Sequence, residues 1–276
     1  MAILSLQSSV VRGYVGNAAA LPLLHRMGVD VWPIDTVMFS NHPAHGAFTG
    51  QTHDPAGIAD LVQGLSGSFD QCDGVLSGYL GQVGTGPVLL DAVAAVKQVR
   101  PDALYCCDPV MGDNGASYVA TGLPEFFRDH GISAADIITP NVYEAAWLTG
   151  MTIESLDTAR DAAQALRAMG PGLVVITGIS CGAELATLAL DGELAWVVMT
   201  PKLDLASYGA GDAFTALFLG CYLASGNAPD ALSRAASGLY AILQTSLDAK
   251  IDGDLRLIQA LDAAVAPREI FTAQRL

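Results

Sequence analysis

The chain has 276 residues, of which 51% are hydrophobic and 15% charged, and its formal net charge is −15 at pH 7. This size and composition predict a single globular α/β domain over residues 1–276, because such domains often reach this length without dividing. The acidic balance argues against a nucleic-acid backbone or an anionic membrane as partner, and without a basic leader or a long apolar run we expect a soluble, cytoplasmic protein.

The chain opens with an apolar segment at 2–6, followed by a polar loop and a helix from about residue 18. In parallel α/β sheets, ligands gather beyond the carboxyl ends of the strands, so Ser8 lies where a small polar substrate would be held. The other interpretation of Ser8 is a loop hydroxyl that bonds its own backbone.

Residues 31–42 read as extended chain, and residues 43–50 read as a turn followed by a return strand. Pro33 and Pro43 flank this stretch, and it lacks helix signals, so we expect a small mobile flap over about 31–50 beside the ligand pocket. His42 within it is a candidate hydrogen-bonding residue, and an exposed loop histidine is the alternative.

Two further apolar strands are followed by residues that could bind a ligand or a metal ion. The strand at 74–81 ends near Tyr79, whose ring is suited to stacking on a flat ligand. The strand at 104–107 is followed by Asp108 and Asp113. Carboxylates beside a polyphosphate usually hold magnesium or its waters, whereas solvated loop acids are the plainer interpretation.

The next strand, at about 137–139, leads into a helix with Asn141 and Glu144 three residues apart. This spacing fits a capping box, and it also aims an amide and a carboxylate at the ligand edge of the sheet. The strand at 173–178 carries Thr177, another polar strand end. The segments 184–190 and 193–198 flank an Asp-Gly pair, which predicts a hairpin and an antiparallel edge.

The glycine-rich stretch at 207–212, Ser-Tyr-Gly-Ala-Gly-Asp, runs directly into an apolar helix. Gly209 and Gly211 allow the backbone to approach a ligand, and the helix N-terminus presents unpaired N–H groups that suit a phosphate. Asp212 places a carboxylate at this anion site, where it is positioned to take a proton as a general base. A helix cap is the alternative role, since Asp is a favoured capping residue.

Six short motifs occur in an order and spacing that resemble one family. They are Gln7-Ser8, Phe39-Ser40-Asn41-His42, Ser77-Gly78-Tyr79, the run 107–113 from Cys107-Asp108 to Gly112-Asp113, the run 139–144 from Thr139-Pro140 to Glu144, and Gly209-Ala210-Gly211-Asp212. The chain resembles the ribokinase-like ATP-dependent kinases over nearly its whole length, and within them the vitamin B6 branch, the pyridoxal kinases. This resemblance implies a three-layer α/β/α fold with a central, mostly parallel sheet, an antiparallel edge and a small flap.

The resemblance also implies residue roles. Asp212 would deprotonate the substrate hydroxymethyl group while the amides of Gly209, Ala210 and Gly211 steady the transferring phosphoryl group. The residues implied around the substrate ring are Ser8, Val15, Phe39, His42, Phe48 and Tyr79. Those implied near ATP, besides the glycine-rich turn, are Asp113, Asn141, Glu144, Thr177 and Gly178. Those implied beside Mg²⁺, or beside a monovalent cation such as K⁺, are Asp108, Asp113, Thr139 and Glu144.

The activity implied is phosphorylation of the 5′-hydroxymethyl of pyridoxal, pyridoxine or pyridoxamine by ATP in vitamin B6 salvage, by a homodimer. A hydroxymethylpyrimidine kinase and a vitamer-binding protein without turnover are the alternatives. The chain departs from the family pattern at Thr177, where many bacterial members have lysine, so the charge that neutralises phosphate must come from metal. It departs again at Pro43-Ala44, where relatives usually have Thr-Gly or Thr-Gln, and at Phe48, where tryptophan is frequent.

Overall fold

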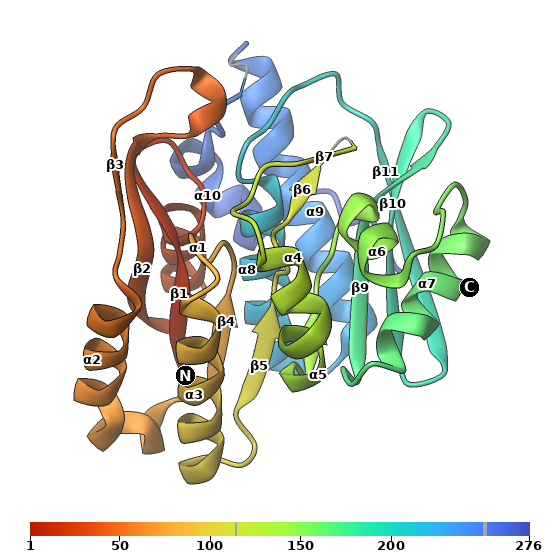
Figure 1. Cartoon of the computed structure of the whole chain (residues 1–276). Helices are drawn as coiled ribbons and strands as arrows, with labels where there is room; N and C mark the ends of the chain where they lie inside the picture. The colour runs from red at the N-terminus through yellow and green to blue at the C-terminus, as the bar shows by residue number, and fades with distance from the viewer. Residues whose placement is uncertain (114, 251–252) are drawn as a thin grey trace.

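The computed structural model describes residues 1–113, 115–250 and 253–276. In this part of the chain a ten-stranded sheet forms the middle layer, in the order β12-β11-β10-β9-β8-β5-β4-β1-β2-β3 (Figure 1). Its six central strands run parallel to one another. They are β1 (Ala2–Arg12), β2 (Asp30–Asn41), β4 (Gly74–Ser77), β5 (Leu104–Cys107), β8 (Ile137–Ile138) and β9 (Leu173–Cys181).

Antiparallel strands complete the sheet on both sides. β3 (Gly50–Thr52) pairs with β2. On the far side the antiparallel strands are β10 (Glu184–Asp191), β11 (Leu194–Pro201) and β12 (Gln274–Arg275). A separate hairpin joins β6 (Gly112–Asp113) to β7 (Ala116–Ser117). The hairpin predicted at Asp191-Gly192 is confirmed, and it connects β10 to β11.

Helices cover both faces of the sheet and define the outer layers (Figure 1). On one face lie α2 (Pro55–Leu65), α3 (Thr85–Val99), α4 (Leu123–Phe126), α5 (Ile132–Ala134), α6 (Val142–Thr149) and α7 (Leu156–Arg167). On the other lie α1 (Asn17–Arg26), α8 (Ala210–Ser225), α9 (Ala228–Asp248) and α10 (Leu257–Val265). Short helical turns occur at η1 (Pro43–His45), η2 (Ser66–Gln71) and η3 (Phe127–Gly131). The three-layer prediction is therefore confirmed.

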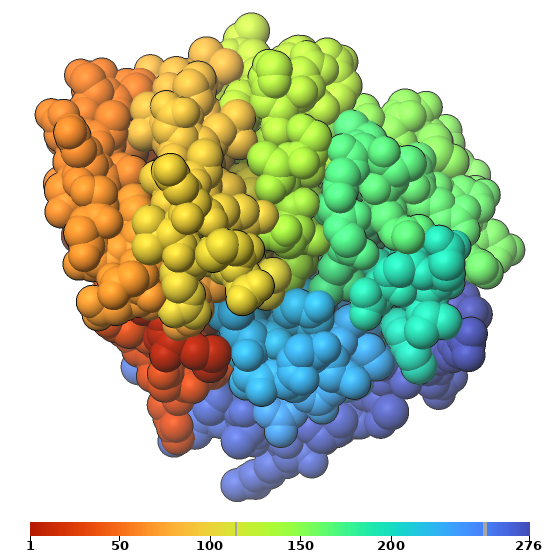
Figure 2. All heavy atoms as spheres, turned by 90° about the horizontal axis from the view of Figure 1, so that it is seen from below, coloured from red at the N-terminus to blue at the C-terminus, as the bar shows by residue number. Residues whose placement is uncertain are grey.

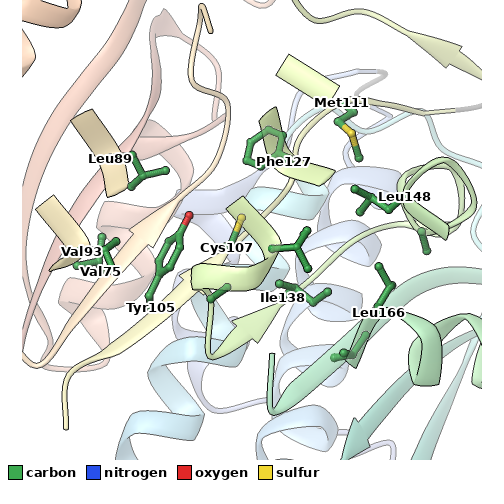
Figure 3. Packing of buried hydrophobic residues seen from close by; sticks show 14 of the residues in the cluster. Val75, Leu89, Val93, Tyr105, Cys107, Met111, Phe127, Ile138, Leu148 and Leu166 are labelled. Carbon is green, nitrogen blue, oxygen red and sulfur yellow. The ribbon is translucent and has the colours of Figure 1, made fainter. Parts of the chain in front are cut away.

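Burial on both faces explains the apolar character of the central strands. Along β1, Leu4 and Leu6 pack into the cluster under α3 and α7, whereas Ile3 faces the cluster under α8 and α9. This alternation is the two-residue period of a strand whose two faces are both covered. Figure 3 shows Tyr105 and Cys107 of β5 within the first cluster, where both side chains are fully buried.

The predicted flap needs a correction in its first half. β2 is a strand of the main sheet, and Val31, Ile34 and Val37 along it are buried, so this half cannot move independently of the core. β3 pairs only with residues 37–39, which leaves Pro33 on the free edge of β2, where a missing N–H is tolerated. Within 31–50, residues 42–49, which include η1, are the part that lies outside the sheet.

The parallel strands place their carboxyl ends along the upper edge of the molecule in Figure 1, and the N-terminus of α8 reaches the same region. Figure 2 shows the opposite face, where the first residues of the chain, in red, lie at the amino end of β1. Of the helices in the described residues, none is long and apolar enough to cross a membrane.

Candidate active site

Asp212 lies in the first turn of α8, three residues after the left-handed Gly209, whose φ is 87°. Gly209 takes the N-cap position and makes no side-chain capping bond, so Asp212 is not the N-cap residue. The Asp212 carboxylate still accepts from its own N–H, a donor of the first helical turn. Burial raises the pKa of the Asp212 carboxyl, and hydrogen bonds from the N–H groups of Gly16 and of Asp212 itself lower it. A carboxylate with a raised pKa at a helix N-terminus is suited to accept a proton.

The loop after β1 packs tightly against this turn. Gly16 has φ 53° and ψ −131°, and a Cβ there would collide with the carbonyl oxygen and the hydroxyl of Ser8. A Cβ at Gly209 would likewise collide with the carbonyl oxygen of Tyr14 and lie 3.2 Å from Val15 Cγ1. Both positions therefore require glycine, and their close approach brings the Gly16 amide to the Asp212 carboxylate.

Asp108 follows β5 and is 5% exposed. Thr215, one turn beyond Asp212 on α8, donates its hydroxyl to Asp108 Oδ2 at 3.2 Å and lies 2.9 Å from Thr139 Oγ1. Burial raises the pKa of Asp108, and the carboxylates of Glu144 and Asp212 raise it further. A phosphate chain entering beside these acids would need a cation to offset the accumulated negative charge.

Glu144 and Asn141 form the capping box at the start of α6. The Asn141 side-chain oxygen accepts from Glu144 N at 2.9 Å, and Glu144 Oε2 accepts from Asn141 N at 2.9 Å. Glu144 Oε1 accepts from Met111 N at 3.0 Å, so both carboxylate oxygens bind the backbone. Burial raises the pKa of Glu144 to about 8, although backbone N–H donors, including that of Gly112, oppose the shift. The local interpretation of this pair is therefore confirmed.

Asn141 also gathers the residues predicted for ATP. Its side-chain amide donates to the carbonyl of Gly112 at 2.9 Å, which ties the exposed Asp113 to the start of α6. Asn141 forms a parallel bridge with Thr177, whose N–H donates to Pro140 O at 3.0 Å. The next residue, Gly178, is exposed with φ 78°. These side chains lie along one edge of the sheet, as the strand order predicts.

The residues predicted to surround the substrate ring fall into two groups. Two of these residues lie at the turn at 208–212. Val15 Cγ1 lies 3.2 Å from where a Cβ on Gly209 would be, and the His42 ring stacks on Tyr208 with centroids 4.5 Å apart. Phe39 and Phe48 instead contact each other, with ring centroids 4.9 Å apart.

Ser8 lies within β1, which corrects the loop predicted after residue 6, and Tyr79 follows the end of β4. Ser8 is 8% exposed and lies against Gly16. The carbonyl of Tyr79 accepts from Thr36 Oγ1 at 2.6 Å, which links the end of β4 to β2, and burial raises the pKa of the Tyr79 phenol. Ser8 therefore lies against the loop that holds Gly16, and Tyr79 lies beside β2.

Three residues of the site escaped the sequence analysis. Thr215 was detectable as a hydroxyl one turn after Asp212 in an otherwise apolar helix. Tyr208 precedes the glycine-rich turn, but only the fold brings it to His42. Gly16 occurs in a loop without a motif, and its contacts with Ser8 and Asp212 are long-range.

The side chains of this site could hold a divalent cation only if the phosphates of the substrate supply further ligands. No cluster of three or more His, Cys, Asp or Glu side chains able to hold a metal occurs in the described residues. Both oxygens of Glu144 accept from N–H groups, so Asp108 is the better candidate ligand. Asp108 Oδ2 lies 4.0 Å from where a Cβ on Gly211 would lie, which places it close to the turn. Mg²⁺ commonly binds through one or two carboxylates, phosphates and waters, so this donor set fits it.

Comparison with known proteins agrees with this geometry. A family model described as phosphomethylpyrimidine kinase matches residues 72–253. The pyridoxal kinase PdxY of Deinococcus radiodurans is 44% identical over 289 residues, covering 99% of this chain and 96% of the relative. The pyridoxal kinase PdxY of Rubrobacter xylanophilus is 41% identical, covering 99% of this chain and 97% of the relative.

Solved structures support the same grouping. The pyridoxal kinase of Leishmania donovani in complex with ADP and pyridoxine matches with a TM-score of 0.94 and 28% identity, over 100% of this chain and 99% of that chain. The fold and the glycine-rich turn define an ATP-dependent kinase with the ribokinase-like fold. Together with the full-length relatives, they show that the chain belongs to the pyridoxal kinase family.

Proposed function

We propose that the chain transfers the γ-phosphoryl group of ATP to the 5′-hydroxymethyl of pyridoxal, or of pyridoxine or pyridoxamine, giving the 5′-phosphate and ADP. The observation that carries this proposal is Asp212, held by Gly16 at the N-terminus of α8, in a chain whose full-length relatives are named pyridoxal kinase. A structure of one relative is described with ADP and pyridoxine.

In the proposed reaction the Asp212 carboxylate takes the proton of the substrate hydroxymethyl. The resulting oxygen nucleophile attacks the γ-phosphorus, and the bond to the β-phosphate oxygen breaks to release ADP. The N–H groups of Gly209, Ala210 and Gly211, with the positive end of α8, stabilise the negative charge on the transferring group. The raised pKa of Asp212 strengthens it as a base.

The remaining site assignments belong to the same proposal. The ring of the vitamer would lie among Ser8, Val15, Phe39, His42, Phe48 and Tyr79. The phosphates of ATP would lie along Asp113, Asn141, Thr177 and Gly178, with Glu144 holding this edge through its backbone contacts. Contacts of Val15 and His42 with the turn at 208–212 support the first set.

We propose Mg²⁺ as the divalent cation, held by Asp108 with Thr139 and the phosphates, and K⁺ as a monovalent activator near the same residues. The cation would neutralise charge on the phosphates, since Thr177 carries none. Turnover should stop in excess chelator and return when Mg²⁺ is restored, and K⁺ should raise it above the rate in Na⁺. Full activity in chelator would contradict this assignment.

A hydroxymethylpyrimidine kinase is the second candidate, and the description of the matching family model favours it. Both reactions phosphorylate a hydroxymethyl group on a flat heteroaromatic ring. An ATP-consumption assay with pyridoxal, pyridoxine, pyridoxamine and hydroxymethylpyrimidine separates them. A higher kcat/KM for the pyrimidine would favour the second candidate, and vitamer binding without ATP consumption would indicate a binding protein.

A single kinase domain, a homodimer and a cytoplasmic location complete the proposal. Sedimentation of the purified chain tests the dimer, and fractionation of the source cells tests the location. A monomer at the concentrations used for kinetics would remove the dimer from the proposal without affecting the chemistry.

A further inference from the structure

Three aromatic rings meet beside the glycine-rich turn. The His42 ring stacks on Tyr208 with centroids 4.5 Å apart and an interplanar angle of 16°. His45 meets the same Tyr208 ring edge-on at 5.4 Å. Because Tyr208 immediately precedes Gly209, this contact joins the segment between β2 and β3 to the turn that carries the proposed base.

A third segment closes the cluster from the C-terminal side. Tyr208 N donates to Gly253 O at 2.8 Å, and a Cβ on Gly253 would lie 2.9 Å from the Tyr208 ring and 3.2 Å from His45 Nε2. Asp254 Oδ1 lies 3.4 Å from His45 Nε2 and Asp254 Oδ2 lies 3.6 Å from an Arg12 nitrogen. Tyr208 is therefore held through both its backbone and its ring.

His42 in turn has few orientations left. Its Nδ1 accepts from Ala44 N at 3.3 Å, which leaves Nε2 as the atom able to donate outward when the ring is neutral. Burial lowers the pKa of His42, His45 lowers it further and Asp254 opposes the shift, and the lowered pKa favours the neutral ring. Stacking on Tyr208 then sets the plane in which the Nε2–H points.

We propose that Tyr208 is a positioning residue for the vitamer. The Tyr208 ring orients the His42 imidazole against the turn at 208–212, so the residue that binds the vitamer ring and the base at Asp212 are held by the same turn. This inference rests on the proposed function, since it assigns His42 to the vitamer ring. Tyr208 acts through His42 and not on the substrate itself. Its contribution is pre-organisation, because a fixed donor loses less freedom when the ligand binds.

The test is a double-mutant cycle with Tyr208→Leu and His42→Ala, measuring vitamer KM, ATP KM, kcat and the vitamer Kd by calorimetry. Tyr208→Leu should raise vitamer KM and Kd by about 2- to 12-fold, the equivalent of one net hydrogen bond, with ATP KM within about 2-fold. In the His42→Ala background it should add less than about 2-fold, because both changes remove the same interaction. Tyr208→Phe keeps the ring and should match the wild type.

Tyr240→Ala provides the matched control, since Tyr240 meets Phe271 edge-on at 4.9 Å on α9. It removes an aromatic contact of similar kind without touching the 208–212 turn, so it should leave vitamer KM unchanged. If circular dichroism shows that Tyr208→Leu does not fold, Tyr208→Ala replaces it. The comparison is then between the raised vitamer KM of Tyr208→Ala and the wild-type vitamer KM expected for Tyr208→Phe.

Two outcomes overturn the proposal in different ways. The role of Tyr208 is overturned if the effects of Tyr208→Leu and His42→Ala are additive, or if Tyr208→Leu changes the KM of ATP and of the vitamer equally. Normal turnover by the wild type would then leave the proposed function intact. A wild-type protein that neither binds nor phosphorylates a vitamer overturns the proposed function, and this inference with it.

Discussion

Gly16→Ala tests whether the loop after β1 holds the proposed base. Gly16 combines φ 53° with ψ −131°, outside the left-handed well that other residues visit, and its missing Cβ leaves room for the carbonyl oxygen of Ser8. The added methyl meets backbone, which cannot move aside as the end of a side chain can. The loop must therefore shift and carry the Gly16 amide away from Asp212.

Gly28→Ala is the matched control at the other end of the same helix. Gly28 also has a positive φ, 79°, but a Cβ there meets nothing within 4 Å in the described structure. Its cost should be the left-handed backbone alone, about 1–2 kcal/mol. Gly16→Ala adds overpacking of about 1–3 kcal/mol to its own backbone strain, so it should lower the free energy of unfolding by at least about that much more than Gly28→Ala does.

Kinetics distinguish a weakened fold from a displaced base. A shift of about 1 Å in a reacting group typically costs about 100-fold in rate, so Gly16→Ala should lower kcat by about 100-fold, whereas Gly28→Ala should keep kcat within about 2-fold. Both are measured at a temperature where circular dichroism shows each variant folded. An unchanged kcat in Gly16→Ala, or an equal loss in Gly28→Ala, would refute the link between this loop and Asp212.

Asp212→Asn should lower kcat by about 10² to 10⁴ and leave ATP KM within a few-fold, and an unchanged steady-state kcat would remove its role as base. Thr215→Val removes the hydroxyl that donates to Asp108 at 3.2 Å, and it should raise the Mg²⁺ concentration for half-maximal rate by about 10-fold or more. Thr215→Ser keeps the hydroxyl and should not change this concentration. Equal Mg²⁺ titrations of Thr215→Val and the wild type would show that the hydroxyl does not support the cation. The pKa of His42 lies below its ordinary 6.5, so vitamer KM should stay flat from pH 8 to about 6.5 and rise at lower pH, when protonated Nδ1 can no longer accept its hydrogen bond. His45→Gln removes a group that lowers this pKa, so the rise should begin at higher pH, and a profile that stays in place or moves to lower pH would contradict the assignment.

Local patterns in the sequence determined the architecture and the glycine-rich turn. Apolar strands buried on both faces, polar residues at their carboxyl ends and the Asp191-Gly192 hairpin each depend on neighbours within a few residues. The turn at 209–212 is equally local, because its glycines and the following helix are contiguous. Such features can be predicted from the sequence because backbone conformation and helix termini are set by short-range sterics and hydrogen bonds.

Contacts between distant segments decided the rest. The sequence of 31–42 has the character of extended chain, but only pairing with β1 shows that it is a core strand and not a flap. The sequence allowed two interpretations for Asp212 and for Glu144, and it did not show that the Gly16 N–H reaches the Asp212 carboxylate or that the Met111 N–H reaches Glu144 Oε1. Long-range packing carries no local period, so the stack of His42 on Tyr208, residues far apart in the chain, could be found only in the folded structure.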